Sequence, residues 1–171
     1  MKTILSMTAM IGALAVSGLM GATSDTAISA ADSRFATKAA AGGMAEVKLG
    51  ELAKTNASSS DVKAFGQKMV DDHSKAGDKL KSIAGKHSIN LPMSMDSKDQ
   101  ATYDRLSKLH GADFDRAYMQ DMVKDHKTDV AEFQKEASSG RNADLKNFAS
   151  ETLPILQEHL RMAQDTAAKV K

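Results

Sequence analysis

Apolar residues recur every three or four positions in four long segments of this chain. The spacing is that of one face of an amphipathic α-helix. Residues that favour turns and caps, mainly Ser, Asn and Gly, separate the segments, so each segment predicts its own helix. These predicted helices cover residues 33–55, 62–87, 113–137 and 142–171. Four helices with one apolar face each can bury those faces only against one another, which predicts an all-α four-helix bundle.

The connection between the second and third long helices has a pattern of its own. Residues 88–96 include Pro92 and show no periodicity. The following Ser97-Lys98-Asp99-Gln100 matches a capping box, which predicts a short extra helix that ends near His110, before Gly111. The connection is long enough either to reverse the chain locally or to run the length of the bundle, and both courses fit the sequence. With the second course the fold is a ferritin-like four-helix bundle with a short extra helix in this connection.

Local residues predict where the first helix begins and where the last helix is kinked. Asp32 and Ser33 stand directly before the first periodic segment and are its candidate N-caps. Pro154 lies inside the last segment, where its missing N–H and its ring predict a kink.

The N-terminal residues resemble a secretory signal peptide. Lys2 precedes an apolar run from Ile4 to Met20, and small residues continue to Ala31. This order of charge, apolar run and small residues predicts cleavage near residues 30/31, which leaves residues 31–171 as the bundle domain. We therefore expect a periplasmic protein, either free or associated with the cell envelope, with no transmembrane segment in the mature chain.

Composition narrows the possible functions. The 171 residues include no Cys, which excludes disulfides, thiolate metal sites and a cysteine nucleophile. Lys and Arg number 23 against 22 Asp and Glu, and a net charge of +1 argues against nucleic acid as a partner. No motif of a serine hydrolase, a nucleotide-binding loop or a zinc protease is present. A binding protein is thus favoured over an enzyme, and no protein partner can be named.

Several motifs resemble those of the bacterial family called domain of unknown function 4142. They are Ala45-Glu46-Val47 with Gly50, Val62-Lys63-Ala64-Phe65 before Asp72-His73, Phe114-Asp115 with Tyr118 before His126, and Leu153-Pro154 before His159-Leu160. The resemblance implies a secreted, ferritin-like four-helix bundle whose biochemical role is not established. The Met-x-x-x-His pattern is also similar to that of the bundles called domain of unknown function 305, some of which are associated with copper.

Three histidines are the candidate metal ligands. His73, His126 and His159 each fall on the apolar face of a different long helix, at similar distances from the connecting turns. Glu46 on the first helix lies near the same height, so three imidazoles and one carboxylate are predicted to meet in mid-bundle.

Methionines on the same helix faces favour copper or another transition-metal ion. Met69 precedes His73 by four residues, and Met122 precedes His126 by four, within two similar five-residue segments. Soft thioether sulfur beside imidazole suits copper better than magnesium or calcium. Met is also a common core filler, and for each methionine taken alone core packing is the favoured explanation.

Other interpretations of the candidate residues remain open. In a purely structural protein the histidines form a buried polar layer, with Glu46, Asp72 or Asp125 accepting their N–H groups. Carboxylate-bridged di-iron chemistry is disfavoured, because the positions three before two of the histidines are valines rather than glutamates. A second candidate soft-metal loop is Met93-Ser94-Met95, with His87 nearby.

Overall fold

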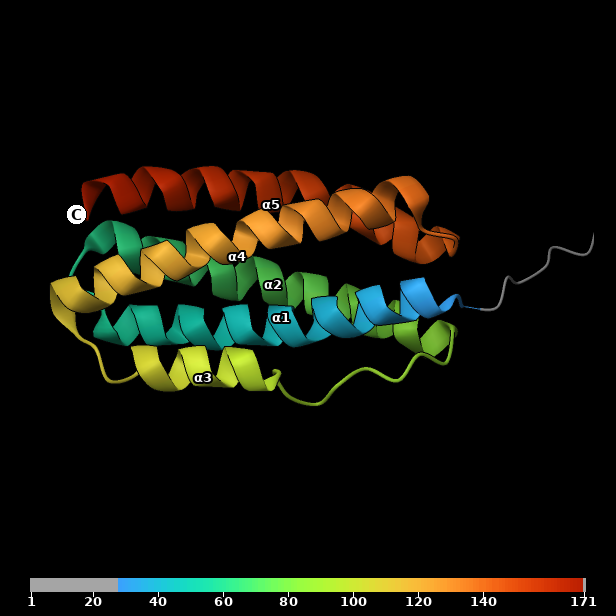
Figure 1. Cartoon of the computed structure of the whole chain (residues 1–171), viewed down its shortest axis with the longest axis horizontal. Coiled ribbons are helices and arrows are strands. Elements are labelled where there is room, and N and C mark those ends of the chain that lie inside the picture. The colour runs from blue at the N-terminus through green and yellow to red at the C-terminus, as the bar shows by residue number, and fades with distance from the viewer. Residues whose placement is uncertain (1–27, 171) are drawn as a thin grey trace, which may run out of the picture.

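The computed structural model describes residues 28–170, which form five α-helices (Figure 1). The helices are α1 (Ala30–Asn56), α2 (Ser60–Lys86), α3 (Ser97–Leu106), α4 (Gly111–Ser139) and α5 (Ala143–Lys169). Between residues 28 and 170 there is no strand, so the all-α prediction is confirmed. The predicted signal peptide, residues 1–30, lies almost entirely outside the described residues. Within that described range, no helix has the length and apolar character needed to cross a membrane.

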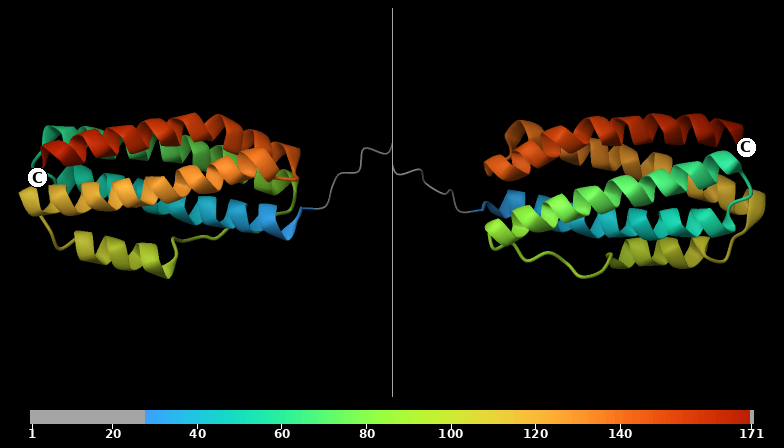
Figure 2. Two further views of the ribbon diagram at one scale, coloured as in Figure 1. Left: turned by 45° about the horizontal axis from the view of Figure 1, so that its top comes forward. Right: turned by 180° about the vertical axis from the view of Figure 1, so that it is seen from behind.

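The four long helices pack as two antiparallel hairpins, α1 with α2 and α4 with α5 (Figure 1). The hairpins meet mainly through α2 against α5 and α1 against α4. The segment after α2 runs along the outside of the bundle and includes α3, which packs on α1 and α4 (Figure 2). Of the two courses that the sequence allows, the crossover is therefore the one adopted. It makes α2 and α4 parallel, as in ferritin-like bundles.

The predicted apolar faces are the faces that are buried, and they form two clusters. One cluster is built around Phe65 and Phe114, and the other around Phe35 and Phe133, whose rings meet edge to face at 4.9 Å between centroids. On each of α2, α4 and α5, the clustered apolar residues before the histidine belong to one cluster and those after it belong to the other. The three candidate histidines therefore form a polar level between two apolar ones.

A pair of glycines sets the distance between α1 and α2. A Cβ atom on Gly50 would lie 2.5 Å from the carbonyl oxygen of Gly66, and one on Gly66 would lie 2.7 Å from the Cβ of Ala53. Neither position has room for a side chain, so the two helix backbones touch here. This close approach lies one turn from Glu46 and thereby brings α1 close to the histidine level.

The first helix begins earlier than the sequence predicts. α1 starts at Ala30, and its N-cap is Ser29, whose hydroxyl accepts a hydrogen bond from the N–H of Asp32 at 3.1 Å. The prediction that Asp32 or Ser33 caps this helix is wrong. The alanines ahead of Asp32 are strong helix formers, so the helix extends back to the preceding serine.

The short helix of the crossover, α3, also begins and ends at other residues than the sequence predicts. Asp96, not Ser97, is the N-cap of α3, and its carboxylate accepts the N–H of Asp99 at 2.8 Å. The helix ends at Leu106 rather than near His110. Gly111 does not end α3 but begins α4, with a positive φ of 61° that turns the chain sharply into the new helix.

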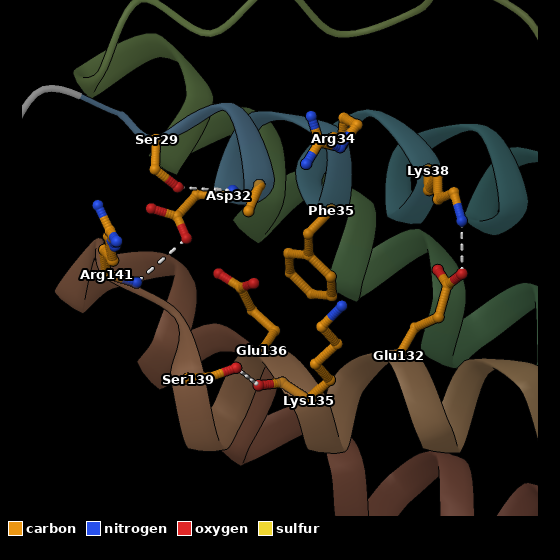
Figure 3. Close-up of a pocket in the computed structure, with 11 residues that line it drawn as sticks. Ser29, Asp32, Arg34, Phe35, Lys38, Glu132, Lys135, Glu136, Ser139 and Arg141 are labelled. Atoms are coloured by element: carbon orange, nitrogen blue, oxygen red, sulfur yellow. Dashed lines mark hydrogen bonds and ion pairs between the residues drawn. The ribbon is translucent and has the colours of Figure 1, made fainter.

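Asp32 has a long-range role that no local pattern predicts. Its buried carboxylate accepts the backbone N–H groups of Arg141 and Asn142, each at 3.1 Å, in the turn before α5 (Figure 3). Asp115 at the start of α4 does the same for the other hairpin, accepting the N–H groups of Ser58 at 3.1 Å and Ser59 at 2.9 Å. Each hairpin turn is thus held by an aspartate of the other hairpin.

The last helix starts as its sequence indicates and continues through proline. Asn142 is the N-cap, and its side chain accepts the N–H of Leu145 at 3.0 Å. Pro154 lies inside α5 without ending it.

Candidate metal centre

The three histidines predicted to converge do so at the centre of the bundle. His73 comes from α2, His126 from α4 and His159 from α5. Their ring centroids are 5.9 Å apart for His73 and His126, and 5.4 Å apart for the two pairs that include His159. The side chains are nearly inaccessible, with relative exposures of 9%, 0% and 1% in that order.

One ring nitrogen of each histidine lies within 4.8 Å of the matching nitrogens of the other two. His73 Nε2, His126 Nε2 and His159 Nδ1 are buried and have no hydrogen-bond partner among the described residues. Two nitrogens bonded to one ion at about 2.0–2.1 Å lie roughly 3.3 to 4.2 Å apart, depending on the bond angle. Small rotations of the imidazoles therefore bring three nitrogens onto one ion.

The opposite nitrogens of two of these rings are fixed by acceptors. His126 Nδ1 donates to the carbonyl oxygen of Met122 at 3.0 Å, and His159 Nε2 donates to Asp72 Oδ2 at 2.8 Å. A carbonyl and a carboxylate accept hydrogen bonds, so the proton sits on these nitrogens and the other nitrogen of each ring keeps its lone pair. Metal-bound histidines in proteins are oriented in the same way. Lys68 in turn binds the same oxygen of Asp72 at 2.9 Å.

Burial keeps the imidazoles neutral. Desolvation, together with the neighbouring histidines, lowers the pKa of His73 to about 3 and that of His126 to about 4. The pKa of His159 is also lowered by burial, although Asp72 opposes the shift. Neutral imidazole is the form that binds a metal, so the site needs little proton release near neutral pH.

Glu46 lies beside the cluster rather than within it. Its Oε1 is 3.8 Å from His126 Nδ1, the nitrogen that bonds to the Met122 carbonyl. The carboxyl group is only 1% exposed, and neither oxygen has a hydrogen-bond partner among the described residues. Burial, reinforced by Asp125 and Asp129, raises its pKa well above the ordinary value. The raised pKa means that the Glu46 carboxyl group favours its neutral form beside His126.

The two candidate methionines are completely buried. Met69 and Met122 belong to the apolar cluster around Phe65. The Phe65 ring lies 6.2 Å from the ring of His126, so this cluster adjoins the histidine level. The backbone carbonyl of Met122, rather than its sulfur, makes the hydrogen bond that orients His126.

Two polar groups near the site have no clear signal in the sequence. Tyr118 is fully buried, and its hydroxyl has no hydrogen-bond partner among the described residues. Burial, and to a smaller extent the charge of Glu46, raises the pKa of this hydroxyl well above 10. Asp129 has a pKa raised to about 7, first by burial and then by Asp125. On an apolar helix face a tyrosine resembles any core aromatic residue. Asp129 lies three residues after His126 and therefore on the same side of the helix, which is the one sign in the sequence of its place near the site.

The cluster can be reached from the surface between α2 and α5. A groove of about 200 Å³ is lined by His73, His159 and Asp72, with Lys75 and Glu151 among the residues farther out. Two of the three histidines thus face a path to solvent.

The second candidate loop is not assembled as predicted. His87 pairs with Asp144 at 2.7 Å between Nε2 and Oδ2, and it does not line the groove that holds Met93 and Met95. The methionines of the loop instead share that groove with Met44 of α1 and with His73.

Comparison with known proteins places the chain in a family. Residues 17–166 match the model of the domain of unknown function DUF4142. The chain belongs to this family. The DUF4142 chain also superposes on the DUF305 fragment from Deinococcus radiodurans with a TM-score of 0.73 at 10% sequence identity, covering 83% of this chain and 98% of that one. At this identity the likeness concerns the fold alone, and it confirms the predicted bundle. No curated protein matches the sequence.

Proposed function

We propose that this DUF4142 protein binds one transition-metal ion through His73, His126 and His159. The observation that carries the proposal is the convergence of three buried histidines, each of which offers one ring nitrogen within 4.8 Å of the other two. Each ring also has a buried nitrogen without a hydrogen-bond partner in the described chain. An unpaired buried acceptor costs about 1–3 kcal/mol, and a shared cation compensates three such groups at once.

A purely structural polar layer is the competing interpretation. Such a layer is favourable when every member has a partner. Two of the rings here use one nitrogen for a protein acceptor, and each of the three rings has a buried nitrogen without a partner in the described chain. A ring that donates a hydrogen bond from one nitrogen and keeps a lone pair on the other is oriented as metal-bound histidines are. This arrangement favours a ligand role over a structural one.

Copper is the ion that we propose. Three imidazoles suit copper, zinc and nickel, and among divalent ions copper binds such donors most strongly. The converging group contains no carboxylate that would favour a hard ion. Met69 and Met122 next to the histidine level add soft donors that side-chain rotation can bring nearer. Glu46 accompanies the site as a carboxyl neighbour of His126.

The proposed location is the periplasm. The signal-peptide pattern of the first 30 residues supports export, and a chain without cysteine suits an oxidising compartment. N-terminal sequencing of protein from the periplasmic fraction is expected to find a chain that starts at Ala31 or Asp32. Such cleavage removes the Ser29 cap, after which the bonds of Asp32 to the turn before α5 still hold the first turn of α1. An intact Met1 in membrane-bound material would contradict the proposed location.

Metal binding is tested by titration with Cu(II), Cu(I) and Zn(II) in competition with a chelator of known affinity. Wild type is expected to bind one equivalent of copper, and His126→Ala is expected to lose most of the affinity because it removes one of three ligands. His110→Ala is the matched control, since His110 is exposed and stands at the start of α4, away from the cluster. Equal weak binding by all three proteins would leave the structural interpretation in place.

A further inference from the structure

A second groove on the bundle is lined by methionines from separate parts of the chain. It lies between α1, α2 and the segment before α3, and has a volume of about 340 Å³. Met44 comes from α1, whereas Met93 and Met95 come from the crossover segment, and His73 of the histidine cluster is also part of the lining. The groove therefore connects three thioethers with one of the proposed metal ligands.

Packing does not account for Met93. Its side chain is 96% exposed, whereas Met95, two residues later, is only 7% exposed. A single exposed methionine is common on protein surfaces, but Met93 lines the same groove as Met44 and Met95, so its sulfur is available to a ligand there. Its three flexible torsions let the sulfur swing toward the groove.

The chemistry of the lining selects for one kind of ligand. Val47 and Leu91 supply apolar wall, and the one carboxylate of the lining, Asp78, pairs with Lys81 at 3.4 Å. A hard divalent cation thus finds no free carboxylate in the groove. A soft, weakly hydrated monovalent cation needs only neutral sulfur donors, which Met44, Met93 and Met95 provide.

The groove is also kept open by the backbone. Gly43 and Gly77 both line it, and a Cβ atom added at either position would touch nothing within 4 Å. The space beside the methionines is therefore open, and His73 is one of the residues that line it.

We propose that Met44, Met93 and Met95 form a capture site for a soft monovalent cation of the Cu(I) class, which then reaches the buried cluster past His73. Only the second step of this inference, the transfer of the ion to the histidine cluster, rests on the proposed metal function. The capture step depends on the thioethers and stands without the histidine cluster.

The capture step is tested in the full-length His126→Ala protein, where the histidine cluster is disabled. Ag(I), a soft monovalent ion that is stable in air, is titrated against a competing ligand. We expect one equivalent to bind, and we expect the added triple change Met44→Leu, Met93→Leu and Met95→Leu to weaken it by about tenfold or more, since leucine keeps the volume but has no donor. Met162→Leu, a partly buried methionine outside the groove, is the control and should bind as before.

Met93→Ser provides a variant that cannot fail by misfolding, because the side chain is almost fully exposed. It should also weaken Ag(I) binding in the same background. Unchanged Ag(I) affinity in both Met93→Ser and the triple variant would overturn the capture site.

The transfer step is measured separately as the rate at which Cu(I) fills the histidine cluster of otherwise wild-type protein. The triple methionine variant should load more slowly, by about tenfold, and reach the same final occupancy. Equal loading rates would overturn transfer through this groove. Absence of copper from the cluster in every variant, with Ag(I) capture intact, would instead refute the proposed metal function and leave the capture site standing.

Discussion

At the scale of single residues, the protonation states of the buried groups decide how the protein responds to pH. The burial that lowers the pKa of His73 and His126 also raises the pKa of Asp129 and Glu136, each to about 7. These two histidines and these two acids are therefore all neutral between about pH 4 and pH 7. As pH rises, the histidines increase the free energy of unfolding and the acids decrease it. A matched variant is therefore needed to measure each effect separately.

The histidines are predicted to make the metal-free protein sensitive to acid. In the unfolded chain an imidazole takes up a proton near pH 6.5, whereas His73 in the folded state does so only near pH 3. Between these values the unfolded state binds more protons, so stability falls as pH falls. Urea unfolding in the presence of a chelator should show wild type losing about 1–2 kcal/mol more than His73→Asn between pH 7 and pH 5. The acidic groups are common to both proteins and cancel. Parallel pH profiles would mean that His73 is not desolvated.

Glu136 is predicted to act in the opposite direction at the end of the bundle. Burial and the nearby Asp32 carboxylate raise its pKa from 4.5 to about 7, and Figure 3 shows its carboxyl group turned toward Asp32. Because the folded state holds the proton longer than the unfolded state, stability falls as pH rises from about 4.5 to 7. Glu136→Gln should therefore be more stable than wild type at pH 8, by about 1 kcal/mol, and nearly equal at pH 4. Urea melts at the two pH values measure this, and a variant less stable at pH 8 would contradict it.

At the scale of helices, the apolar period predicts which faces are buried, but it does not predict the contacts that link distant segments. The face of α5 predicted from residues such as Leu145, Leu156 and Ala163 is the buried one, because the period of 3.6 residues is a property of the local sequence. The sequence predicts a local capping role for Asp32, whereas its carboxylate binds the turn before α5, more than 100 residues away. Such a partner depends on the topology of the whole bundle and leaves no mark in the neighbouring sequence.

The contact between Gly50 and Gly66 yields a prediction at the same scale. Gly66→Ala places a methyl group 2.7 Å from the Cβ of Ala53 and 2.8 Å from the carbonyl oxygen of Gly50, so α1 and α2 must separate. We expect a loss of about 1–3 kcal/mol in chemical unfolding. Gly85→Ala on the same helix is the control, because its Cβ would meet nothing within 4 Å. It should gain about 0.5–1 kcal/mol from helix propensity, and similar effects of the two changes would contradict the close approach.

At the scale of the whole molecule, the crossover connection explains how three distant histidines meet. It makes α2 and α4 parallel, so the similar segments that end in His73 and His126 lie at the same height, and α5 returns to bring His159 beside them. The sequence predicts this meeting from helix faces and distances along the chain. It does not predict which ring nitrogens face the centre, because Asp72 and the Met122 carbonyl fix that only in the folded state.

The central claim is that the three inward-facing nitrogens share one metal ion, and X-ray absorption at the copper edge tests it most directly. Full-length protein loaded with one equivalent of copper is predicted to show three imidazole nitrogens at about 2.0 Å, with the multiple scattering of intact rings. His126→Ala should show one ring fewer or lose the ion, and His110→Ala should match wild type. A wild-type spectrum with fewer than two imidazoles, or one unchanged by His126→Ala, would contradict the claim.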